Sequence, residues 1–328
     1  MKFKEITGIT GKYPGTAAVA GAEDPHVLTA VSDALKAGIK FFLTGRKDRI
    51  IEIAEKNAID ISDAGIIEPG GSEIESAGNF ENAVCLLAAR ICSEGTAGVL
   101  MKGLVSTASF TRAVLNKEIG LTPEGNLLSH VGLFSDPRYS ENKEGFTGNG
   151  SSVMTEQPEI FLVTDAAINI QPDLETKKKI IANAVKTARS IGIEKPNIAL
   201  LAPVEKINSK IQSTLDAAEL AQWVNSGVLG NAAAEGPFAL DVAASAEAAE
   251  IKGIKGSVPG HTDIYVVPDL DAGNILYKAL KIFAGADAAG ILAGADVPVV
   301  LTSRSDSENV KKASLGFALA AAAGLTEN

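Results

Sequence analysis

Short apolar runs alternate with helix-like segments along most of this chain. The apolar runs stand at 17–21, 40–44, 66–68, 97–101, 160–163, 198–202, 264–267 and 297–301. Parallel neighbours in a sheet need a crossover connection, which is usually a helix, so this alternation is typical of a parallel sheet covered by helices. The sequence therefore predicts an α/β fold. Helices are expected over 25–36, with Asp24 as N-cap and Pro25 in the first turn, over 80–93, over 174–191 with Asp173 as cap, and over 275–284.

The length of 328 residues predicts two domains, because domains hold about 150 residues on average. The alternation stops in residues 135–157, which hold Gly, Ser, Asn and charged residues with little apolar periodicity. Such a segment is typical of a loop or a hairpin tip at a domain edge. We place the first crossing between domains there.

The net charge limits the partners. Lys and Arg number 30 against 40 Asp and Glu, a formal charge of −10, which repels nucleic acid and anionic membranes. No apolar run reaches the roughly 18 residues of a membrane span, and the N-terminus has no apolar signal run. We expect a cytoplasmic protein that binds neither nucleic acid nor membrane.

Cys85 and Cys92 are expected to be reduced core thiols.

One hydroxyl-rich turn follows the last apolar run and precedes a helix expected at 309–322. It contains Thr302, Ser303, Arg304, Ser305, Asp306, Ser307 and Glu308. Hydroxyl groups, backbone N–H groups and a guanidinium at a helix N-terminus are the donors that bind an anion. The alternative is a capping sequence, with Ser305 or Ser307 as N-cap and Glu308 in the first turn.

A second turn of the same kind precedes a helix expected at 110–116. It contains Lys102, Ser106, Thr107, Ser109 and Arg112. Ser109 and Arg112 are three residues apart, so on a helix starting near Ala108 they share a face and could converge on one oxyanion. The alternative is a solvated helix face.

The residues that several other kinds of binding or catalytic site require are missing from this sequence. Ile6 and Tyr13 replace the leading glycine and the hydroxyl residue of a phosphate loop, and no Gly-x-Gly-x-x-Gly follows a strand. His26, His130 and His261 are scattered without metal-ligand spacing, so no metal site is expected. Neither cysteine lies beside a cationic group that would activate it as a nucleophile.

These turns, in this order, resemble the phosphate acetyl/butyryltransferase family, and within it the butyryltransferases. Seven segments spread over nearly the whole chain carry the resemblance. They are 18–24 (AVAGAED), 102–112 (KGLVSTASFTR), 129–131 (SHV), 164–169 (TDAAIN), 236–241 (GPFALD), 267–278 (VPDLDAGNILYK) and 300–307 (VLTSRSDS).

The resemblance implies two three-layer α/β/α domains with mostly parallel sheets, as in isocitrate and isopropylmalate dehydrogenases, with the active site in the cleft between them. One domain would be discontinuous, 1–134 with 297–328, and the other would be 135–296. The implied reaction is acyl-CoA + phosphate ⇌ acyl phosphate + CoA, with coenzyme A as a substrate and no tightly bound cofactor. A homodimer or a higher homo-oligomer is also implied.

By the same resemblance, Ser303 would hydrogen-bond the CoA sulfur, and Arg304 with Arg112 would hold phosphate. A carboxylate after the Ser-Arg pair would be the general base. The acetyltransferases have consecutive aspartates there, whereas this chain has Asp306, which we favour, or Glu308. The residues expected to bind substrate are Lys102, Ser106, Thr107, Ser109, Asn274, Lys278, Thr302, Ser305 and Ser307.

A second departure from the acetyltransferases concerns acyl length. They carry an arginine in the helix after the Gly-Asn-Ile turn, where this chain has Lys281, Ile282 and Phe283. Apolar atoms would suit a longer acyl chain, so butyryl is preferred to acetyl. Alternatively, Lys281 points to solvent and says nothing about chain length.

Two functions of other classes are weighed beside this one. A metal-dependent NAD(P) dehydrogenase of the related fold needs paired aspartates on a helix, and Asp269 and Asp271 have the wrong spacing. A non-catalytic acyl-CoA sensor would be expected to lose Ser303, Arg304 or Arg112, and this chain keeps all three.

Overall fold

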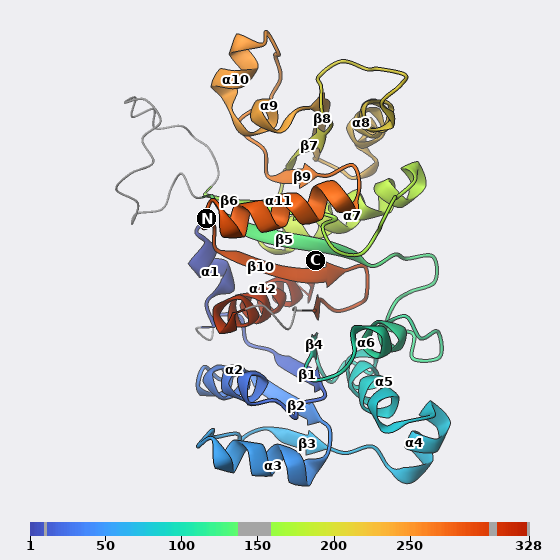
Figure 1. Ribbon diagram of the computed structural model, residues 1–328, viewed down its shortest axis with the longest axis vertical. Coiled ribbons are helices and arrows are strands. Elements are labelled where there is room, and N and C mark those ends of the chain that lie inside the picture. Colours follow the sequence, from blue (N-terminus) through green and yellow to red (C-terminus); the bar gives the residue numbers. More distant parts are fainter. Residues whose placement is uncertain (10–11, 137–158, 302–306, 327–328) are drawn as a thin grey trace. The chain divides into compact units, whose positions relative to one another are not determined.

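The computed structural model describes residues 1–9, 12–136, 159–301 and 307–326, which form two compact units (Figure 1). Unit 1 comprises Met1–Ile6 and Ser129–Ala288, and unit 2 comprises Thr7–Leu128 and Ala289–Asn328. The chain changes unit at 6/7 and then at 128/129 and 288/289, and the sequence placed domain boundaries near the last two, at 134/135 and 296/297. Strands β5 (Ser129–Ser135) and β10 (Ala288–Ala293), which the sequence did not predict, lie at these two changes.

The sheet of unit 2 has the strand order β3-β2-β1-β4-β11-β10. All neighbours are parallel except β10, which is antiparallel to β11. The further strands are β1 (Thr16–Ala20), β2 (Lys40–Thr44), β3 (Gly65–Ile67), β4 (Val99–Lys102) and β11 (Val299–Val300). Strand β1 lies inside the sheet, so its apolar residues from Ala17 to Ala20 are fully buried.

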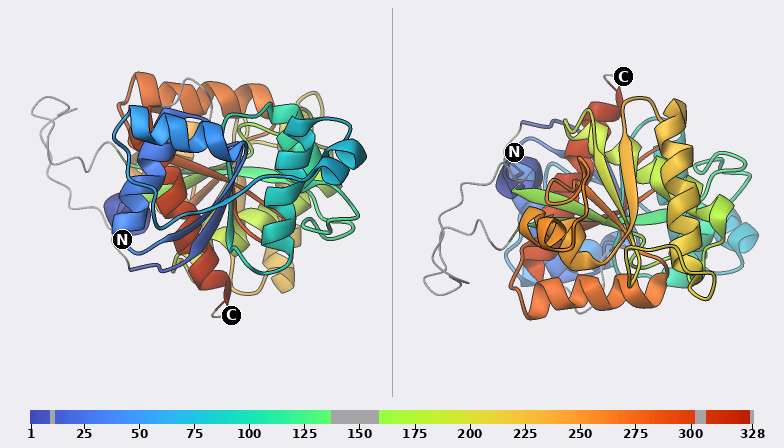
Figure 2. Two further views of the ribbon diagram at one scale, coloured as in Figure 1. Left: turned by 90° about the horizontal axis from the view of Figure 1, so that it is seen from below. Right: turned by 90° about the horizontal axis from the view of Figure 1, so that it is seen from above.

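Helices cover both faces of this sheet. Helix α5 packs on one face against β1, β2 and β4, and α2 and α12 pack on the other (Figure 2). The helices are α2 (Pro25–Lys36), α3 (Lys47–Lys56), α4 (Gly71–Ala77), α5 (Phe80–Ser93), α6 (Thr107–Val114) and α12 (Glu308–Thr326). Asp24 caps α2 by accepting a bond from the Val27 amide, and Pro25 occupies the first turn, as the sequence predicts.

The sheet of unit 1 has the order β5-β6-β9-β7-β8, parallel except for β5 against β6. Its further strands are β6 (Ile160–Thr164), β7 (Asn197–Leu201), β8 (Ala233–Phe238) and β9 (Ile264–Val266). Besides most of α1 (Phe3–Thr7), its helices are α7 (Leu174–Ser190), α8 (Gln212–Trp223), the π-helical turn η2 (Val224–Val228), α9 (Leu240–Ala244), α10 (Ala246–Ile251) and α11 (Leu270–Ile282). Aromatic contacts fill its core: the Phe134 ring lies 5.6 Å from Phe161 and 5.1 Å from Tyr277.

The predicted mixed α/β fold with mostly parallel strands is confirmed. The errors lie in particular elements: β8 was missed because Ala-Ala-Glu-Gly-Pro-Phe lacks the β-branched residues that mark a strand. Helix α11 begins at Leu270 rather than at 275, because Asp269 caps it through the Ala272 amide. Helix α6 begins at Thr107 rather than at 110, and only Val299–Val300 of the strand expected at 297–301 joins the ladder.

Candidate functional site

The turns that follow β1, β2, β3 and β4 meet at one edge of the unit 2 sheet, because these strands run parallel. Backbone bonds join the turns: the Gly21 amide donates to Thr44, and the Gly103 amide donates to Ala20. Gly103 passes so close that a Cβ there would overlap the Gly21 carbonyl oxygen. Ligands of open α/β sheets bind at this carboxyl edge.

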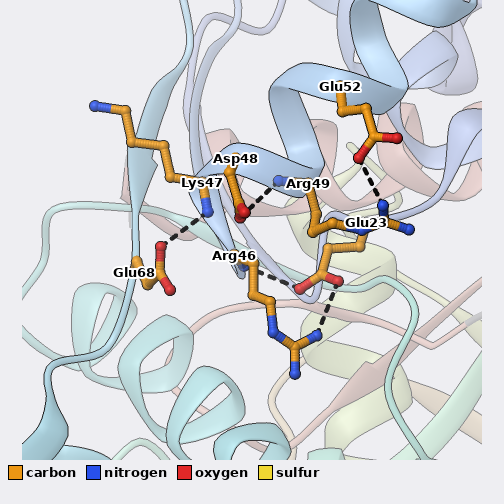
Figure 3. Close-up of polar contacts among 7 residues, drawn as sticks. All are labelled: Glu23, Arg46, Lys47, Asp48, Arg49, Glu52 and Glu68. Carbon is orange, nitrogen blue, oxygen red and sulfur yellow. Dashed lines mark hydrogen bonds and ion pairs between the residues drawn. The ribbon is translucent and has the colours of Figure 1, made fainter.

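The β2–α3 turn is held by two carboxylates from neighbouring turns (Figure 3). Glu23 accepts a 2.9 Å bond from the Arg46 amide and a 3.4 Å bond from its guanidinium, and Glu68 accepts a 3.0 Å bond from the Lys47 amide. The Arg46 guanidinium also lies 4.5 Å from the centre of the Phe80 ring. Sequence reasoning did not single out Arg46, whose place beside the edge comes only from the strand order.

The β4–α6 turn gathers three of the predicted residues around a carboxylate that was not predicted. Ser106 is the N-cap of α6: its Oγ accepts a 3.1 Å bond from the Ser109 amide and donates a 2.7 Å bond to Oε1 of Glu81. Lys102, at the end of β4, is only 7% exposed. Thr107 and Arg112 are exposed on α6. Ser106 therefore serves as a helix cap, a role that the sequence did not predict for it, while Arg112 stays a predicted phosphate ligand.

The same contacts determine the charge of Glu81. The hydroxyl groups of Ser106 and Ser109 lower the pKa of this carboxyl from its ordinary value, and the charge of Lys102 adds to the effect, while partial burial opposes it. A lowered pKa keeps Glu81 ionised at neutral pH. A carboxylate of α5 thus lies beside hydroxyl groups that the sequence predicted as part of an anion site.

The thiols confirm the structural interpretation of the cysteines. Cys85 and Cys92 are free and buried, and burial raises the pKa of each to about 12. At pH 8 the thiolate fraction is then on the order of 10⁻⁴, so we expect iodoacetamide to leave the native protein unlabelled within an hour while labelling both residues in urea. Mass spectrometry of the two samples measures this, and rapid native labelling of either cysteine would contradict it.

The second predicted turn is described only at its end. Thr302, Ser303, Arg304, Ser305 and Asp306 lie outside the described residues. Ser307 acts as a helix cap, since its Oγ accepts a 3.4 Å bond from the Val310 amide. The Glu308 carboxylate lies 2.7 Å from the Lys312 ammonium. Of the two carboxylates considered as base, Glu308 is thus held by a cation.

In unit 1, the turn after β6 packs against the first turn of α11. Asp165 is buried and accepts bonds from the Ala167 and Ile168 amides at 2.9 and 3.0 Å. The side-chain amide of Asn274 donates to the Ala166 carbonyl at 3.4 Å. Asn274 therefore holds this turn, and Lys278 is exposed further along α11.

The residues used to argue acyl length lie at the end of α11. The Lys281 ammonium lies 5.5 Å from the centre of the Tyr277 ring. Ile282 and Phe283 are 71% and 88% exposed. Because these two side chains are exposed within unit 1, they give no support to the preference for a butyryl group.

Neither a metal group nor a membrane helix occurs in the described ranges. Within residues 1–9, 12–136, 159–301 and 307–326, no three His, Cys, Asp or Glu side chains gather to hold a metal ion. No helix of that part of the chain is long and apolar enough to cross a membrane.

Known proteins share both the sequence and the fold. The family model described as "Phosphate acetyl/butaryl transferase" matches residues 70–315. A phosphate butyryltransferase of Clostridium acetobutylicum is 40% identical over 319 residues, 96% of each chain. A phosphate acetyltransferase of Rhizobium meliloti is 36% identical over 94% of this chain and 92% of its own.

A solved structure agrees with these relatives. The branched-chain phosphotransacylase from Enterococcus faecalis V583 superposes with a TM-score of 0.75 and 32% identity, over 94% of this chain and 98% of that one. The matches in sequence and in fold extend over nearly the whole chain and confirm the resemblance carried by its turns. The chain belongs to the phosphate acetyl/butyryl transferase family.

Proposed function

We propose that this protein transfers a short acyl group between coenzyme A and phosphate, with butyryl as the preferred group and acetyl as the alternative. The observation that carries the proposal is the 40% identity to a phosphate butyryltransferase over 96% of both chains. The cation and hydroxyl groups of the β4–α6 turn support it, because they lie at the edge of a parallel sheet where anionic ligands bind.

The proposed reaction is a direct transfer. The CoA thiolate attacks the carbonyl carbon of the acyl phosphate, the carbon–sulfur bond forms, and the bond from carbon to the phosphate oxygen breaks with its electrons leaving on phosphate. Ser303 would hydrogen-bond the sulfur, Arg304 and Arg112 would bind the departing phosphate, and Asp306 would take the thiol proton. Donors that strengthen their bonds as charge develops on phosphate lower the barrier.

The finer features of this proposal come from the family. The active site would lie in a cleft between the two α/β/α domains, 1–134 with 297–328 and 135–296. The remaining ligands of CoA and phosphate would come from the predicted substrate-binding set. The enzyme would be a cytoplasmic homo-oligomer with no tightly bound cofactor.

Phosphate-dependent release of CoA from acetyl-, propionyl-, butyryl- and valeryl-CoA tests the proposal. We expect kcat/KM to rise from acetyl to butyryl by up to about 15-fold, since each buried methylene contributes about 0.8 kcal/mol. Highest activity on acetyl-CoA would identify the alternative substrate. Release that does not depend on phosphate would contradict the whole class, and NADH formation with a hydroxy acid would favour the dehydrogenase.

A further inference from the structure

Glu81 joins two helices at the carboxyl edge of unit 2. It stands in the first turn of α5, and its Oε1 lies 2.7 Å from Oγ of Ser106, the N-cap of α6. A hydroxyl group has one hydrogen to donate, and an ionised carboxylate can only accept. Ser106 therefore donates its hydrogen to Glu81 while accepting from the Ser109 amide at 3.1 Å. Its hydroxyl has no hydrogen left for a substrate oxygen.

Lys102 stands at the start of the same turn. It ends β4 with 7% of its surface exposed, and its ammonium donates a 3.4 Å bond to the Gly103 carbonyl. Its positive charge adds to the lowering of the Glu81 pKa. Strand β4 and helix α5 pack together in the same unit.

We infer that Glu81 is the positioning residue of the β4–α6 turn: it orients the Ser106 cap so that the turn binds phosphate. The inference rests on the proposed function, in which this turn binds the phosphate of the reaction. It changes one expectation drawn from the sequence, since Ser106 then acts through the turn and not as a donor to the substrate.

The inference predicts that removing the Glu81 charge changes phosphate affinity in the direction opposite to the one that charge alone would give. Removing a negative charge near an anion site should by itself strengthen phosphate binding. If Glu81 orients the turn, removing its charge weakens phosphate binding, because Ser106 then donates to a neutral acceptor or to none, and bonds to a neutral acceptor are weaker than bonds to a carboxylate. Glutamine at this position keeps an oxygen that can accept from Ser106, whereas alanine loses this contact.

The experiment measures kcat and KM for phosphate in wild type, Glu81→Gln, Glu81→Ala and Glu94→Gln. We expect Glu81→Gln to raise KM for phosphate about 10-fold with kcat changed less than threefold, and Glu81→Ala to lower kcat/KM by about 100-fold, since bonds to charged groups have about that effect. Glu94, an exposed carboxylate at the other end of α5, is the matched control and should leave both constants unchanged. A KM for phosphate that falls or stays the same in Glu81→Gln would overturn the inference.

A second comparison tests whether Glu81 acts through Ser106. Ser106→Ala combined with Glu81→Ala should cost no more than about threefold beyond the more damaging single variant, because residues that act together are not additive. Ser106→Thr keeps a hydroxyl cap and should restore most of the phosphate affinity. Effects that multiply fully in the double variant, or no rescue by threonine, would contradict action through the cap.

Phosphate binding without turnover separates failure of this inference from failure of the proposed function. Inorganic phosphate should raise the melting temperature of wild type, and the rise should be at least halved in Glu81→Gln. A wild type that binds phosphate without acyl transfer would refute the proposed function alone. Equal shifts in wild type and Glu81→Gln, or no shift in either, would overturn the role of Glu81.

Discussion

Replacing Arg304 by alanine is expected to lower phosphate-dependent acyl transfer by at least about 100-fold, with no change in the thermal unfolding of the protein. In the proposed reaction, phosphate leaves the acyl carbon with a growing negative charge, and a guanidinium can meet two of its oxygens at once. Removing one preoriented donor of this kind typically lowers kcat by about 10² to 10³. The CoA-release assay with butyryl-CoA and phosphate measures the effect.

Two further variants make this result specific. Arg304→Lys should keep part of the activity, because an ammonium retains the charge but not the paired hydrogen bonds. Arg49→Ala is the matched control: Arg49 lies on α3 with its guanidinium 2.6 Å from Glu52, and both side chains are more than half exposed (Figure 3). It should have wild-type activity. Wild-type activity in Arg304→Ala would show that the site is assigned to the wrong residues.

The largest loss of stability is expected for Asp216→Ala, about 3 to 5 kcal/mol in the free energy of unfolding. The Lys177 ammonium of α7 lies 2.6 Å from Oδ2 of Asp216 on α8, and the two side chains are 8% and 12% exposed. The Gln212 side-chain amide donates to the other carboxylate oxygen at 2.7 Å. Alanine would leave the Lys177 charge buried and uncompensated, and this causes the loss.

Urea unfolding followed by tryptophan fluorescence measures this effect. Trp223 is the single tryptophan and ends α8, so its emission reports on the helix that carries Asp216. Lys177→Met combined with Asp216→Leu should lose much less, because apolar side chains of similar volume replace the pair without leaving a buried charge. Glu52→Ala, which breaks an exposed pair, should change stability by less than about 1 kcal/mol. An unchanged midpoint in Asp216→Ala would contradict a stabilising role for the buried pair.

The helices and strands that could be predicted from the sequence are those marked by local residue patterns. Asp24 before Pro25 and Asp173 before α7 are helix starts that depend only on a side chain and the amide three residues later. Helix α5 was predicted at its observed bounds, because its apolar period and its Asn79 cap are both local. β8 was missed because its own residues are not typical of a strand, and only its pairing with β7, distant in sequence, makes it one; β5 likewise forms a strand by pairing with β6.

The residues of the candidate site also fall into two groups, those that the local sequence indicated and one that only the packing of helices revealed. Lys102, Ser106 and Ser109 were recognised because hydroxyl and cationic residues after a strand are an unusual local composition. Glu81 was not, since an acidic residue in the first turn of a helix is common and favourable for the helix dipole. Its contact with Ser106 spans 25 residues of chain and exists only because α5 and α6 pack together.

The sequence by itself determined the α/β class, the order of most elements, the two hydroxyl-rich turns and the family, because these depend on residue type and spacing along one chain. The tertiary structure alone decided which groups face one another: Glu81 with Ser106, Arg46 with Glu23, and Lys177 with Asp216. The physical reason is that hydrogen bonds and ion pairs act over a few ångströms in space, and helix packing and strand order set that distance between residues far apart in sequence.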